Sequence, residues 1–306
     1  LLMTAPERSN LVIEDCEFSD IMQSYGTYQP SGSQWARAIS VEGKGKVSNL
    51  TIRNNIGIRL DTFYGAQVQL DGLFLESNTV AKCGGNCYSL GAKDMHVRDS
   101  VFLRDTPSAL FMYGTTDIIV GTVTGNNSIE NTDFNARGEM IGGPDGCAVD
   151  FETAATGFLI KGNTFSRSWG AGLMVFGHDS TSHNFTVDDN LFLHSGCEQT
   201  AGDRAGISFM CPNGHKPNGV VSNNAFLNCP GVPALHFNDN VRGCGDGIRQ
   251  VANTIVNEST SAGTPTAPLV AVAMPTILFQ PPSPNSQLAS VMVPVKAATT
   301  TAGATL

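Results

Sequence analysis

Residues 142–176 read GGPDGCAVDFETAATGFLIKGNTFSRSWGAGLMVF and contain the pattern that decides the fold. In the segment AVDFE, apolar and acidic residues alternate, so a β-strand would place Val149 and Phe151 on one face and Asp150 and Glu152 on the other. The segment IKGNTF that follows contains the end of a second strand, an asparagine turn and a phenylalanine that we expect to face the core. Because this second unit recurs along the chain, we interpret the stretch as one repeat of a larger array.

The recurring element is an asparagine followed two residues later by an apolar residue. The apolar positions are Phe18, Ile56, Val80, Phe102, Phe134, Phe165, Phe192, Phe226 and Ile255, and most are preceded by an asparagine: Asn54, Asn78, Asn163, Asn190, Asn224 and Asn253. A second strand per repeat is expected at 38–42, 67–71, 109–113, 148–152, 172–176, 206–210 and 234–238. Repeats of about thirty residues built only from short strands predict a solenoid of parallel strands, whereas a propeller blade would need four strands and about forty residues.

This repeat resembles the right-handed parallel β-helix proteins of the pectin-lyase-like superfamily, in which stacked asparagines form a ladder between the second and third sheets. The resemblance implies an all-β, three-sheet right-handed parallel β-helix of about eight to nine coils. The strand at 148–152 and its equivalents then form the first sheet. We expect a β-helix domain at 1–258, and we interpret 259–306, rich in Thr, Ala, Pro and Ser, as a linker or poorly ordered tail.

Charge and cysteine content limit the binding partners and the cellular location to be expected. The net charge of −9 without a basic cluster argues against nucleic acid as a partner, and no apolar run is long enough to cross a membrane. Eight cysteines, with N-x-S/T sequons at Asn49, Asn126, Asn184 and Asn257, favour an oxidising, extracellular location. We therefore expect a secreted, monomeric, glycosylated protein whose partner is a polysaccharide or oligosaccharide.

The cysteines also suggest bridges between coils. Cys197 and Cys229 occupy similar loops of adjacent repeats, and Cys211 and Cys244 both follow expected first-sheet strands, so each pair is placed to form a disulfide. For the others two pairings stay open. Cys87 can pair with Cys83 in a small loop or with Cys147 across coils.

Candidate catalytic residues lie on the outward side of the first sheet. Residues i and i+2 of a strand are about 6.6–7 Å apart, close to the separation of the two carboxyl groups in inverting glycosidases. Asp150 and Glu152 are therefore the predicted acid/base pair of a glycoside hydrolase. Asp145 and His178 on the flanking loops are further catalytic candidates, and the expected substrate-binding residues are Arg137, Phe111, Tyr113, Arg167, Trp169, Phe176 and His236.

Several alternatives remain open. The two carboxylates can be a solvated strand face, can pair with Arg137 and Arg167, or can bind Ca²⁺ together with Asp145; otherwise no cofactor or metal is expected. The protein can instead be a polysaccharide lyase or epimerase acting on an acidic glycan, or a non-catalytic glycan-binding or adhesin-type β-helix. The N-T-D at 131–133 and the pair Asp188-Asp189 resemble polygalacturonase signatures, but they fall at the asparagine turn and on the second sheet, away from the expected groove.

Overall fold

The structure of this protein is a computed structural model. It describes residues 1–4, 7–21, 37–42, 45–60, 62–66, 69–83, 88–90, 92–104, 118–120, 127–130, 133–136, 147–151, 156–166, 168, 170–176, 181–197, 204–238 and 241–257. The β-helix belongs to a unit spanning Leu1–Ser259. The expected tail lies outside the described residues, so that part of the domain prediction stays a prediction.

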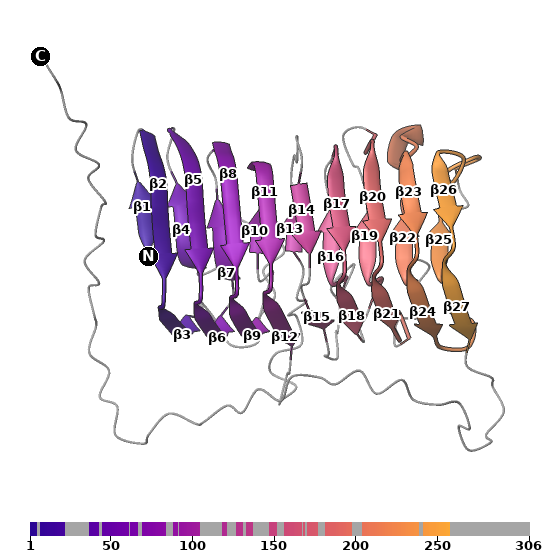
Figure 1. The fold of residues 1–306 in the computed structure, drawn as a ribbon, viewed down its shortest axis with the longest axis horizontal. Helices are drawn as coiled ribbons and strands as arrows, with labels where there is room; N and C mark the ends of the chain where they lie inside the picture. Colours follow the sequence, from indigo (N-terminus) through magenta and orange to yellow (C-terminus); the bar gives the residue numbers. More distant parts are fainter. Residues whose placement is uncertain are drawn as a thin grey trace, which may run out of the picture. The chain divides into compact units, whose positions relative to one another are not determined.

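Three parallel sheets of nine strands each build this unit, and each coil contributes one strand to every sheet (Figure 1). The first sheet contains β1 (Leu2–Thr4), β4 (Arg37–Glu42), β7 (Thr62–Ala66), β10 (Tyr88–Leu90), β13 (Ile118–Val120), β16 (Val149–Phe151), β19 (Leu173–Val175), β22 (Ile207–Phe209) and β25 (Leu235–Phe237). The second contains β2 (Glu7–Glu14), β5 (Lys46–Arg53), β8 (Gln69–Glu76), β11 (Ala92–Arg98), β14 (Asn127–Glu130), β17 (Phe158–Lys161), β20 (Phe185–Asp188), β23 (Gly219–Ser222) and β26 (Ile248–Val251). The third contains β3 (Glu17–Ile21), β6 (Ile56–Leu60), β9 (Thr79–Cys83), β12 (Val101–Arg104), β15 (Asp133–Ala136), β18 (Thr164–Ser166), β21 (Leu191–Leu193), β24 (Ala225–Asn228) and β27 (Thr254–Asn257). The predicted all-β, three-sheet solenoid is thereby confirmed.

Inward side chains of successive coils stack into a continuous core. In the third sheet, Phe192 stacks between Phe165 and Phe226 with ring centroids 4.7 and 4.8 Å away. The first and second sheets face each other through this core, because the ring of Phe151 in β16 lies 4.1 Å from that of Phe158 in β17. These rings are fully or almost fully buried, so each coil completes its apolar environment only by stacking on its neighbours.

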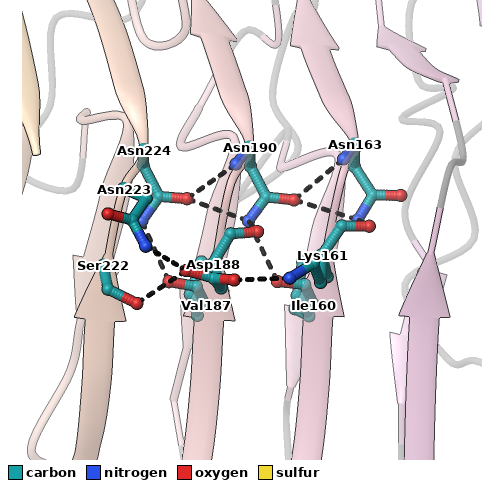
Figure 2. Close-up of polar contacts among 9 residues, drawn as sticks. All are labelled: Ile160, Lys161, Asn163, Val187, Asp188, Asn190, Ser222, Asn223 and Asn224. Atoms are coloured by element: carbon teal, nitrogen blue, oxygen red, sulfur yellow. Dashed lines mark hydrogen bonds and ion pairs between the residues drawn. The ribbon is translucent and has the colours of Figure 1, made fainter.

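The asparagine ladder is formed by buried side chains at the turn between the second and third sheets (Figure 2). The Asn190 Oδ1 accepts hydrogen bonds from the backbone N–H of Asn163 and from its Nδ2, both at 3.0 Å. Asn224 accepts from Asn190 in the same way, at 3.0 and 2.9 Å. The Nδ2 groups of Asn190 and Asn224 also donate to backbone carbonyls of the preceding coil, those of Ile160 and Val187. The ladder therefore satisfies backbone groups at the turn that would otherwise be buried without partners.

One ladder position differs from the predicted one. Asn55, not Asn54, occupies the ladder in the second coil, where its Oδ1 accepts the backbone N–H of Cys16 at 3.0 Å. The inward residue two positions later is Gly57, which aligns with Phe18 and Val80, while Ile56 is 42% exposed. The prediction failed because glycine carries no hydrophobic signal. The space beside it is filled by the ring of Phe63, which would lie only 2.7 Å from a Cβ at Gly57.

Two predicted first-sheet strands are also misplaced. In the third coil the first-sheet strand is β7, whereas Gln69 and Asp71 belong to β8 of the second sheet. The strand next to β16 is β13, an Ile-Ile-Val segment, and residues 109–113 lie outside the described residues. The strands that form are rich in aromatic or β-branched residues, Phe63 and Tyr64 in β7 and Ile118, Ile119 and Val120 in β13, which favour extended structure.

Two disulfides join adjacent coils as predicted. Cys197 is bonded to Cys229, and Cys211 to Cys244. Cys83 and Cys87 are not among the residues whose side chains are described, so the other predicted pairings remain predictions.

Candidate active site on the first sheet

Strand register aligns one outward position per coil along the first sheet. From the second coil onward this column of positions is occupied by Ser40, Gly65, Ser89, Ile119, Asp150, Met174, Ser208 and His236. The neighbours of Asp150 along the column are therefore Ile119 and Met174.

Asp150 is buried although it faces away from the core, with an exposed fraction of 1%. The interpretation of this carboxyl group as part of a solvated strand face is therefore wrong. Removing a carboxyl group from water is costly for its ionised form unless it is bonded or paired. A carboxyl group held in such a position is either part of a polar network or a group whose protonation state the protein controls.

A second, smaller apolar cluster lies on this outer face. Cys147, Ala171 and Met174 are buried together, and the half-buried Phe176 and Met210 pack against them. Phe176 was predicted as a substrate-binding residue. It directly follows β19, the strand that contains Met174. The cluster thus places an aromatic ring and a thioether beside the coil that carries Asp150.

The last coils add polar groups to the same face. Ser208 is fully buried, and its Oγ donates to the Sδ of Met210 at 3.7 Å. His236, a predicted substrate-binding residue, is half-buried and lies directly beside Ser208 in the neighbouring strand. The sequence analysis assigned no role to Met174, Ser208 or Met210, because methionine and serine carry no specific catalytic signal.

Most other predicted site residues cannot be placed. Asp150, Phe176 and His236 are described, and all three lie on the first sheet or at its edge. Outside the described residues lie Glu152, Asp145, His178, Arg137, Phe111, Tyr113, Arg167 and Trp169. Of the predicted acid/base pair, the structure describes only Asp150, so the pair stays a prediction.

Asp188 is placed as the sequence predicted, on the second sheet and not on the first. Its Oδ2 accepts from the Nζ of Lys161 at 2.8 Å, and its Oδ1 accepts from Ser222 and Asn223, both at 2.8 Å (Figure 2). These hydrogen bonds lower the pKa of the Asp188 carboxyl group from 3.8 to about 2. These bonds to the two neighbouring coils explain the presence of Asp188 as a stabilising residue, without a catalytic role.

Among the described side chains, no group of three or more His, Cys, Asp or Glu residues is arranged to hold a metal ion. The Ca²⁺ alternative depended on Asp145 and Glu152, so it is not tested. In the same part of the chain, no helix has the length and apolar character needed to cross a membrane.

Comparison with known proteins decides the family. The family model of the right handed beta helix region matches residues 4–192, more than half of the chain. The chain belongs to this family. No curated protein and no solved structure matches it significantly. The match confirms the predicted right-handed parallel β-helix, but a β-helix fold alone does not identify a reaction, since function resides in the site and not in the scaffold.

The disulfides of this right-handed β-helix protein also bear on its location. Two inter-coil bridges are observed, and structural disulfides are typical of oxidising compartments. An extracellular location is therefore weakly supported.

Proposed function

We propose that this β-helix protein is a secreted glycoside hydrolase that binds a polysaccharide along the outer face of its first sheet. Asp150 and Glu152 would be its catalytic carboxyl groups. The observation that supports the proposal is the position of Asp150, a carboxyl group that faces outward from the first sheet and is yet 1% exposed, between Ile119 and Met174.

The environment suggests a division of roles between the two carboxyl groups. In glycosidases the general acid is commonly the carboxyl group in the more apolar surroundings, while its partner stays ionised in a more polar one. We therefore assign Asp150 as the acid that protonates the glycosidic oxygen and Glu152 as the base. The base takes a proton from the water that attacks the anomeric carbon from the opposite face of the sugar. A spacing of about 6.6–7 Å between residues i and i+2 leaves room for this water.

The neighbouring side chains suit a sugar ligand. Phe176 and Met210 are half-buried at the edge of the outer apolar cluster, where they can contact the apolar face of a pyranose ring. His236 lies farther along the same face. Because Asp150 is buried, a productive complex requires the sugar to replace the atoms that cover it, which also removes bulk water from the reacting bond. Asp145, His178, Arg137, Arg167 and Trp169 remain candidates for contacts from the flanking segments.

A polysaccharide panel tests the proposal. Each glycan is assayed in parallel for new reducing ends and for the absorbance of unsaturated products. The enzyme samples are the wild-type protein, Asp150→Asn and Glu152→Gln. We expect reducing ends without unsaturation, and a loss of at least about 100-fold in kcat/KM in each variant, since positioned acid/base groups contribute about 10²–10⁴-fold.

Asp189→Asn is the matched control. Asp189 is exposed on the second-sheet side and has a φ of 55°, a conformation that asparagine tolerates well. This variant should keep full activity. Unsaturated products would instead indicate the lyase, and glycan retention without turnover would indicate the non-catalytic binding protein. Undiminished hydrolysis by a folded Asp150→Asn variant would contradict the assignment of this residue.

A further inference from the structure

Two sequons occupy the same position in different coils of the second sheet. Asn49 precedes Leu50 and Thr51 in β5, and Asn184 directly precedes β20. Both asparagines are exposed and both have a φ of 54°. The backbone therefore has the same left-handed conformation at both sites. Asparagine is among the few residues with a side chain that adopt this left-handed conformation readily.

The side chains around Asn184 leave its amide accessible. Phe185 points into the core and is almost fully buried, while Thr186, the hydroxyl residue of the sequon, is half-buried on the outer face with Asn184. The amide of Asn49 instead donates from Nδ2 to Oδ1 of Asn10 in the preceding coil at 3.0 Å. In the part of the chain that the structure describes, no such bond is made by the amide of Asn184.

The second sheet faces away from the candidate active site. Phe185 of β20 and Phe209 of β22 stack at 5.9 Å in the core between the first and second sheets. The outer faces of the two sheets therefore point in opposite directions. A bulky group on Asn184 would project into solvent and leave the outer face of the first sheet free.

We propose that Asn184 is an N-glycosylation site and that its glycan covers the outer face of the second sheet. The donor class is an oligosaccharide linked through a diphosphate to a polyprenyl lipid. A bond forms between Nδ2 of Asn184 and C1 of the first sugar, and the bond from C1 to the diphosphate oxygen breaks. The polyprenyl diphosphate leaves, and the amide loses one proton to a base of the transferase. The proposal depends on passage through a secretory compartment and not on hydrolysis by Asp150.

Cell-free translation with endoplasmic-reticulum microsomes tests this site. The full chain is fused to a cleavable secretion signal, and site occupancy is read by mass spectrometry after enzymatic glycan release in heavy-oxygen water. We expect Asn184 to be modified in most translocated molecules, and more completely than Asn49. Thr186→Ala should abolish the modification of Asn184, and Thr186→Ser should retain it.

A gain-of-site variant provides the positive control. Asn218 aligns with Asn184 in the next coil, is exposed, and is followed by Gly219 and Val220, so Val220→Thr completes a sequon there. This variant should gain a second glycan. Translocated protein that carries a glycan at Asn218 in this variant but none at Asn184 would overturn the proposal. Loss of polysaccharide hydrolysis in other variants would leave it untouched, because the two experiments have separate readouts.

Discussion

The hydrogen bonds of Asp188 make this residue a source of pH-dependent stability. Its partners Lys161, Ser222 and Asn223 come from the coils on either side, and the Asp188 side chain is 17% exposed. The pKa of the carboxyl group in the folded state, about 2, lies below its ordinary value of 3.8. The folded state is therefore stabilised above about pH 4, and this contribution is lost as the pH falls from about 4 to 2.

Asp188→Asn should accordingly reduce the free energy of unfolding by about 1–2 kcal/mol at pH 7, after allowance for screening by solvent. The difference from the wild-type protein should shrink toward zero as the pH approaches 2. Urea unfolding at several pH values measures it, with Asp189→Asn as the control that changes little. A difference that does not vary with pH would contradict the role assigned to the Lys161–Asp188 contact.

Asn190 is hydrogen-bonded to both neighbouring coils of the ladder (Figure 2). Its side chain bonds the backbone and amide of Asn163, the carbonyls of Ile160 and Asp188, and Oδ1 of Asn224. Asn190→Ala leaves buried backbone groups without partners, and we expect a loss of about 2–4 kcal/mol in stability. Thermal and urea unfolding measure it. The control is Asn218→Ala, since Asn218 is exposed and its φ is not positive, and for it we expect less than about 0.5 kcal/mol.

At the scale of the element, the second sheet carries a line of alternating charges. Register places Glu14, Arg53, Glu76, Arg98, Glu130, Lys161 and Asp188 side by side, one per coil. Arg53 bonds Glu14 through Nε at 2.7 Å, and its other neighbour in the line is Glu76. Opposite charges on adjacent strands stabilise the pairing, and a shifted register would separate them.

Arg53→Glu would place three acidic side chains side by side in this line. Because like charges on adjacent strands repel, we expect a loss of about 1–2 kcal/mol at low ionic strength. Most of this loss should be recovered in 1 M salt, where the screening length is about 3 Å. Arg249→Glu is the control, since Arg249 is exposed on β26 and makes no ion pair within the described part of the chain. A destabilisation that salt does not relieve would point to lost packing instead.

At the scale of the whole molecule, the disulfides divide the solenoid into differently constrained parts. Both bridges join the last three coils, and Cys211 and Cys244 are 0% and 3% exposed, whereas Cys197 and Cys229 are half-buried. In a solenoid each coil contacts only its neighbours, so a local constraint acts locally. A structural disulfide contributes about 2–4 kcal/mol.

We therefore expect mild reductant to open the Cys197–Cys229 bridge before the Cys211–Cys244 bridge. Amide hydrogen exchange should then accelerate in β21 and β24, with β5 and β8 unchanged. Mass spectrometry of peptides before and after reduction measures both effects, and the Cys197→Ser/Cys229→Ser protein should reproduce them without reductant. Equal acceleration in β5 and β8 would show that the solenoid unfolds as one cooperative unit.

The sequence by itself determined the solenoid, its coil length and most of its register. Buried asparagines and the apolar residues two positions beyond them, such as Asn190 and Phe192, recur at one place in most of the described coils because only stacked coils can satisfy both. The bridges between Cys197 and Cys229 and between Cys211 and Cys244 were predictable for the same reason, since equivalent loops of adjacent coils must lie close together.

Only the tertiary structure decided which residues occupy the positions that lack a hydrophobic pattern, and which side chains of the outer face are buried. Gly57 carries no hydrophobic signal because it has no side chain, and the ring of Phe63 fills the space beside it. In the first-sheet strands β7 and β13, apolar and polar residues do not alternate. Asp150 has the sequence signature of an exposed residue and is yet buried, because its environment comes from side chains far apart in the sequence. Periodicity reports which face a side chain occupies, whereas burial depends on what packs against that face.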